Sequence, residues 1–138
     1  MQGIFPQASR CPPPGNRWSR SARIIDEYVS PGNITIVIEP LNRGESNIVN
    51  SAAEGYELSR AADRKSIQLL VDYYHMALEN ESVDIILKAG KSVRHCHISN
   101  PDGRSFPSGK DGAVYDDFLR ALGENRLYRT TQRGGLYK

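Results

Sequence analysis

Short apolar runs alternate with amphipathic stretches along the middle of the chain, and the runs recur roughly 30 residues apart. Two of them, Ile34–Ile38 and Ile67–Val71, are rich in apolar and β-branched residues, which is typical of strands buried on both faces. A third strand is expected at Val93–Ile98. Each run is too short for a helix, so the pattern predicts strands separated by longer connecting segments.

The segments around these strands carry apolar residues every three or four positions, as on one face of an amphipathic helix. This spacing predicts helices over Trp18–Val29, Ala52–Asp63, Val83–Leu87 and Val114–Leu122. Gly90 and Gly123 follow the last two helices, as C-terminal glycines often do. Alternating strands and helices indicate βαβ units, so we expect an α/β fold with a parallel sheet.

Composition narrows the class of protein. A chain of 138 residues, 38% of them hydrophobic, has the size and apolar content of one globular domain and excludes disorder as the default. The net charge is only +2, with basic and acidic residues interspersed, so no nucleic-acid or membrane-surface partner is expected. The chain lacks an apolar run that could span a membrane, and its first residues do not resemble a signal peptide, which favours a cytoplasmic location.

Polar residues stand at the carboxyl ends of all three expected strands. Glu39 follows the first strand, Asp72 the second, and His97 lies near the end of the third. Parallel α/β folds place their chemistry at this edge of the sheet, where the three side chains would open onto the same face. Two carboxylates and an imidazole form a mixed oxygen and nitrogen ligand set, which suits Mn²⁺, Co²⁺, Mg²⁺ or Zn²⁺.

Two further residues lie close by in the sequence. His75 comes three residues after Asp72, just outside the strand, and is expected near a substrate; Arg104 in the next loop could hold a hydroxyl or phosphate group. Structural roles compete with these assignments: Asp72 could cap a turn through Tyr73 to Met76, Glu39 could cap the following loop, and His75 could simply be packed.

The third strand holds His95, Cys96 and His97 in succession. We expect only one of the two histidines to face the site, while Cys96 points the other way as a small core residue.

Three motifs, in this order, resemble those of the sugar phosphate isomerase/epimerase family, the xylose isomerase-like TIM barrels that include tagatose and psicose 3-epimerases. They are Ile36-Val37-Ile38-Glu39-Pro40-Leu41-Asn42-Arg43, Leu69-Leu70-Val71-Asp72-Tyr73-Tyr74-His75-Met76, and His95-Cys96-His97-Ile98 with Asp102-Gly103-Arg104. The resemblance implies a partial (β/α)₈ barrel containing about strands 5 to 7 and their helices. Residues 1–17 would be a remnant of the loop after strand 4, residues 18–123 the barrel portion, and residues 124–138 a disordered or out-of-register tail.

The resemblance also implies roles for the polar residues. Glu39, Asp72 and His97 would be ligands of a divalent metal, Glu39 would also be catalytic, and His75 and Arg104 would bind the sugar. The implied reaction is isomerisation or epimerisation of a sugar or sugar phosphate, in which a proton is transferred next to a carbonyl.

The chain departs from the family pattern in length and in one catalytic residue. Its 138 residues are fewer than the roughly 250 of a complete barrel. The second catalytic glutamate expected on strand 8 has no counterpart, so the chain is expected to be a truncated product that has lost most of its catalysis. The competing hypothesis is a catalytically dead half-barrel that serves as a structural or interaction module and forms a homo-oligomer through its exposed sheet edges. A DNA-repair function of the endonuclease-IV-like branch is disfavoured, because it needs a basic groove and more than the three histidines present.

Overall fold

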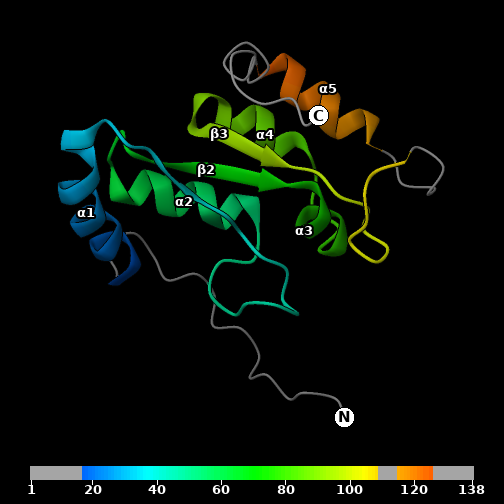
Figure 1. Ribbon diagram of the computed structural model, residues 1–138, viewed down its shortest axis with the longest axis horizontal. Helices are drawn as coiled ribbons and strands as arrows, with labels where there is room; N and C mark the ends of the chain where they lie inside the picture. Colours follow the sequence, from blue (N-terminus) through cyan, green and yellow to red (C-terminus); the bar gives the residue numbers. More distant parts are fainter. Residues whose placement is uncertain (1–16, 109–114, 126–138) are drawn as a thin grey trace.

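The computed structural model describes residues 17–108 and 115–125, arranged as three parallel strands with helices packed against them (Figure 1). In chain order the elements are α1 (Arg17–Val29), the 3₁₀ turn Ser30–Gly32, β1 (Ile36–Ile38), α2 (Ala52–Ala62), β2 (Ile67–Asp72), α3 (Tyr73–Leu78), α4 (Asp84–Ala89), the 3₁₀ turn Gly90–Ser92, β3 (Val93–His97) and α5 (Asp116–Glu124).

The sheet has the order β1-β2-β3, and both neighbouring pairs are parallel. This confirms the predicted α/β class and the alternation of strands and helices. β1 is shorter than expected, since Ile34 is exposed and its amide bonds to the end of α1 at Val29, so pairing with β2 begins only at Ile36. The register places Asp72 of β2 opposite His97 of β3.

Side chains from the helices pack against one face of the sheet. Leu69 and Val71 of β2 are fully buried in the main core, together with Phe118 of α5 and Ile86 of α4. A smaller cluster joins Ile67 to the first two helices through Ala22 and Ala62. Successive residues of a strand point to opposite faces, so Leu70 and Asp72 lie on the face that these helices do not cover.

The turn after β1 is held against α2 by a close approach. A Cβ added at Gly55 of α2 would lie 2.8 Å from Pro40 Cγ and 2.8 Å from Leu69 Cδ1. Only a residue without a side chain allows the helix to lie this near the strand end. Because Pro40 directly follows Glu39, this contact helps to position the Glu39 carboxylate at the end of β1.

Several helix boundaries differ from those expected. Helix α3 was not predicted as a helix; it begins directly after β2, and its six residues give too short a pattern for periodicity to reveal. Gly123 lies inside α5, which continues to Glu124, so its assignment as a residue beyond the helix was wrong. Gly90 does cap α4, with a φ of 52°. The segments expected as a remnant loop and a tail lie almost wholly outside the described residues.

Side chains cap both α2 and α3 at their first turns. Ser51 accepts a hydrogen bond from the Glu54 amide before α2, and Asp72 accepts one from the Tyr74 amide before α3. Among the described residues, no helix is long and apolar enough to cross a membrane.

Candidate active site

Three polar side chains from three strand ends meet at the carboxyl edge of the sheet. His97 Nδ1 lies 2.9 Å from Glu39 Oε1 and 3.8 Å from Asp72 Oδ2. The parallel arrangement brings these residues together although Glu39 and His97 are 58 positions apart in the sequence. The structure therefore groups the three residues predicted as metal ligands.

Asp72 serves two purposes with its two oxygens. Its Oδ1 accepts a hydrogen bond of 2.9 Å from the Tyr74 amide and caps α3, as the structural alternative for this residue predicted. Its Oδ2 faces His75 and His97, 3.8 Å from a ring nitrogen of each. Since the side chain is 3% exposed, the cap holds a buried carboxylate oxygen toward the imidazoles.

His75 is buried on the first turn of α3, and its side chain is 4% exposed. Its Nδ1 accepts a hydrogen bond from the Asn42 amide at 3.1 Å, and the Asn42 side-chain nitrogen lies 2.9 Å away. The ring is thus packed, as one alternative held, and at the same time it borders the group of Glu39 and Asp72.

Arg104 reaches back over the site from the loop after β3. Its guanidinium lies over the Tyr74 ring, 4.7 Å from the centroid, and within 3.4 Å of Glu45 and of His75 Nε2. Arg104 adopts a φ of 52°, a conformation that residues other than glycine seldom adopt and that concentrates at functional sites. Although half exposed, this arginine is not merely a solvated loop residue.

Glu45 lies between Arg104 and Asn42. It accepts a hydrogen bond of 3.0 Å from Asn42 Nδ2 and pairs with Arg104. The hydrogen bond from Asn42, together with the positive charge of Arg104, lowers the pKa of the Glu45 carboxyl below its usual range. The carboxylate is therefore the form available to accept hydrogen bonds in this group.

His95 shares its face of β3 with His97, and their rings stand edge to face with centroids 5.1 Å apart. The two histidines therefore do not point to opposite faces, because residues two apart on a strand lie on the same side, and the described contacts with Glu39 and Asp72 are made by His97. Cys96 points the other way and packs against the main core, as expected. Burial, with a smaller effect of the Asp72 charge, raises the pKa of the Cys96 thiol.

The donor atoms fit a hard or borderline divalent cation. Ligand atoms of Glu39, Asp72 and His75 all lie within 4.8 Å of one another. His97 Nδ1 lies 2.9 Å from Glu39 Oε1, so two imidazoles border the same pair of carboxylates. Carboxylate oxygens with imidazole suit Mn²⁺, Co²⁺ or Zn²⁺ and do not select one of them.

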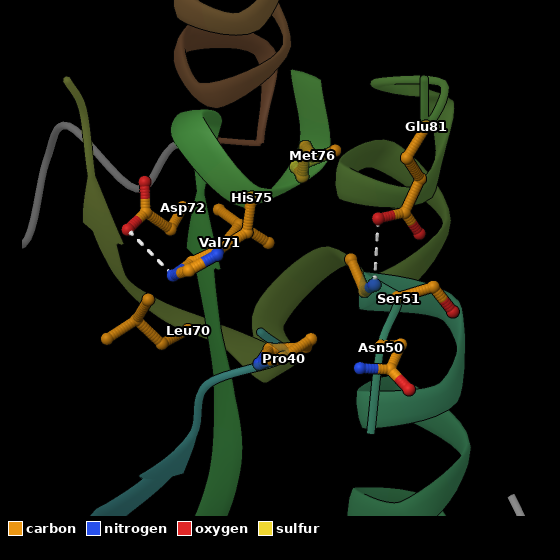
Figure 2. Close-up of a pocket in the computed structure, with 10 residues that line it drawn as sticks. Pro40, Asn50, Ser51, Leu70, Val71, Asp72, His75, Met76 and Glu81 are labelled. Carbon is orange, nitrogen blue, oxygen red and sulfur yellow. Dashed lines mark hydrogen bonds and ion pairs between the residues drawn. The ribbon is translucent and has the colours of Figure 1, made fainter. Parts of the chain in front are cut away.

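A shallow hollow lies beside this group, between the strand ends and α2 (Figure 2). Its enclosed volume is only about 10 Å³, far below the 300 Å³ or more of typical ligand pockets. Asp72 and His75 face each other on one side, and Glu81 points toward the first residues of α2 from the other. The Glu81 carboxylate accepts the Ala52 and Ala53 amides, and burial raises its pKa.

Asn42, Glu45 and Tyr74 were not singled out as site residues from the sequence. The first two belong to the loop that follows Glu39 and Pro40, a position that marks them as neighbours of a strand-end site. Their contacts with His75 and Arg104 depend on how two loops fold toward each other, which no local pattern reveals.

Comparisons with known proteins agree on one family. The model of the xylose isomerase-like TIM barrel family matches residues 9–130. A probable ketose 3-epimerase of Synechocystis is 30% identical over 107 residues, and D-psicose 3-epimerase of Agrobacterium fabrum is 31% identical over 81 residues. These matches cover 77% and 58% of this chain, but only 37% and 28% of the relatives.

A crystal structure of D-psicose 3-epimerase in the presence of D-fructose superimposes with a TM-score of 0.71 at 27% identity. The superposition covers 78% of this chain and 37% of that one. The chain thus spans about two fifths or less of the length of these proteins, which agrees with the open, three-stranded sheet formed by the described residues.

Proposed function

Because this chain belongs to the xylose isomerase-like TIM barrel family, we propose that it supplies the metal and sugar site of a ketose 3-epimerase. The observation that supports this most strongly is the meeting of Glu39, Asp72 and His97 at the carboxyl edge of the sheet, with Glu39 and Asp72 within 3.8 Å of one imidazole nitrogen. The relatives named ketose and psicose 3-epimerases point to the same reaction class.

Glu39, Asp72 and His97 would hold a divalent metal ion. When bound, such a cation supplies a Lewis acid that polarises the ketose carbonyl and acidifies the neighbouring C–H bond. Glu39 is one third exposed, so its carboxylate is accessible to exchange a proton with that carbon.

His75 and Arg104 would bind the hydroxyl groups of the sugar. The Arg104 guanidinium is stacked on Tyr74 and paired with Glu45, which holds its N–H donors beside His75. Glu45 adds an acceptor to these donors. A polyhydroxylated ketose offers both donors and acceptors, so the mixed set suits a sugar better than an apolar ligand.

Titration calorimetry with Mn²⁺ and Co²⁺ tests the metal site. The Glu39→Gln, Asp72→Asn double variant is expected to lose at least tenfold in affinity. A matched control is Glu57→Gln, Asp63→Asn, which makes the same change in charge at two exposed residues of α2 and its C-terminal cap. Equal affinity of both double variants would contradict the proposal.

An assay of D-fructose conversion to its C3 epimer tests the chemistry and separates it from the alternative of an inert structural module. Metal-dependent conversion that disappears in the Glu39→Gln, Asp72→Asn variant supports the enzyme. A stable oligomer by size-exclusion chromatography, with neither metal binding nor conversion, supports the inert module.

A further inference from the structure

We propose that Asn42 is a positioning residue that holds the proton of His75 on Nε2, and that His75 is thereby a hydrogen-bond donor and not a metal ligand. The part that concerns substrate rests on the proposed function. The contacts that determine the tautomer are within the described chain and can be tested without activity.

The main chain of Asn42 sets the first constraint. Its N–H donates to His75 Nδ1 at 3.1 Å. An amide N–H can only donate, so Nδ1 must present its lone pair. A neutral imidazole carries one proton, which this contact places on Nε2.

The side chain of Asn42 gives the same result independently. Asn42 Oδ1 accepts the Gly44 amide at 2.9 Å, which fixes the orientation of the carboxamide. Its Nδ2 then faces two acceptors, His75 Nδ1 at 2.9 Å and Glu45 Oε1 at 3.0 Å. One N–H bond of the amide points to each acceptor, so the single Nδ1 lone pair is shared between the main-chain and side-chain N–H groups of Asn42, which is only 6% exposed. Turning the amide over would place its oxygen against the Glu45 carboxylate and leave a buried group unpaired.

The other ring nitrogen is then a donor. Near His75 Nε2 lie Asp72 Oδ2 at 3.8 Å and an Arg104 nitrogen at 3.4 Å. The arginine also only donates, so its contact with a protonated Nε2 is not a hydrogen bond, and the ring N–H remains available to an oxygen of the sugar.

A nitrogen that keeps its proton has no lone pair for a metal ion, although His75 lies close enough to Glu39 and Asp72 to be taken for a ligand. His97 is constrained in the opposite way. Its Nδ1 contacts are with carboxylate oxygens, so in the metal-free chain Nδ1–H donates to Glu39, and a cation held by these carboxylates would take the place of that proton. His97 is therefore the imidazole suited to bind a metal ion, and His75 is the one suited to donate a hydrogen bond.

Long-range ¹H–¹⁵N NMR of the full chain, labelled with ¹⁵N-histidine, reads the tautomer directly. His75, His95 and His97 are assigned with single His→Gln variants. For His75 we expect a pyridine-like shift for Nδ1 and a pyrrole-like shift for Nε2 in the metal-free protein. The reverse pattern, or one averaged shift for both nitrogens, would overturn the proposal.

Variants separate positioning from a general effect on folding. Asn42→Asp turns a carboxylate oxygen toward Nδ1, so the fraction of the Nε2-protonated tautomer should fall. Asn42→Ala keeps the main-chain N–H donor, so His75 should keep its proton on Nε2 in this variant. Asn42→Ala also serves as the second test if Asn42→Asp does not fold. Asn50→Asp changes another buried asparagine nearby, one whose side chain bonds to Leu41 and Ser46 and makes no described contact with His75. An identical change of the His75 shifts in Asn42→Asp and Asn50→Asp would refute the positioning role.

Addition of Zn²⁺, which is diamagnetic, distinguishes this proposal from the proposed function. We expect the His97 shifts to change while His75 keeps its Nε2 proton. Loss of that proton on zinc binding would overturn the assignment of His75. If zinc does not bind, the proposed metal site fails, but the tautomer in the metal-free protein still decides the role of Asn42.

Discussion

The close approach of α2 to the end of β1 predicts opposite outcomes for one substitution at two helical glycines. In Gly55→Ala, the added methyl group would lie 2.8 Å from both Pro40 Cγ and Leu69 Cδ1. Leu69 is fully buried and Pro40 is part of a rigid ring, so neither can move aside easily. Overpacking of this kind costs about 1–3 kcal/mol, against a gain of about 1 kcal/mol from the better helix propensity of alanine. The expected net change is a loss of up to about 2 kcal/mol in the free energy of unfolding.

Gly123→Ala in α5 is the matched control, because a Cβ there would meet nothing within 4 Å. It should stabilise the protein by up to about 1 kcal/mol. Urea denaturation followed by circular dichroism measures both variants, and Gly55→Ala should be less stable than Gly123→Ala by about 1–3 kcal/mol. Since Pro40 follows Glu39, the affinity for Mn²⁺ should fall as well in Gly55→Ala alone. Equal stabilisation by the two substitutions would refute the packing argument.

Two further substitutions test the core and a buried carboxylate. Phe118→Ala removes a ring that is 1% exposed and should lower the free energy of unfolding in urea by about 3–5 kcal/mol. Phe106→Ala, at a side chain that is 85% exposed, should change it by less than about 0.5 kcal/mol. Similar losses in the two variants would contradict the assigned core. Burial raises the pKa of Glu81 above its ordinary 4.5, so the folded state favours the protonated carboxyl. Protonation of Glu81 therefore stabilises the fold below pH 4.5, and this stabilisation is lost as the pH rises through the raised pKa. The free energy of unfolding of wild type, measured relative to Glu81→Gln, should therefore be larger at pH 4 than at pH 7, and a difference that does not vary with pH would refute the effect of burial.

The strand pattern was sufficient to predict which three polar residues meet. Carboxyl ends of parallel strands share one edge, so Glu39, Asp72 and His97 could be grouped before their distances were known. The grouping of these residues follows from the periodicity of the strands and from the parallel topology that their alternation with helices predicts.

The contacts that differentiate the two imidazoles could not be predicted in this way. Asn42 and His75 are 33 positions apart, and their hydrogen bond depends on the path of an irregular loop. Helix α3 escaped prediction because it is six residues long and begins directly at the end of a strand. The capping bond of Asp72 was foreseen as an alternative to a metal role, but the structure shows that one carboxylate can serve the cap with one oxygen and face the site with the other.

Calorimetric titration of Mn²⁺ into four single variants tests the central claim most directly. Glu39→Gln, Asp72→Asn and His97→Gln should each lower the affinity at least tenfold, because each removes a proposed ligand. His75→Gln should leave the affinity within about twofold of wild type, because His75 keeps its Nε2 proton and binds no metal. Loss of affinity in His75→Gln with wild-type affinity in His97→Gln would contradict the account.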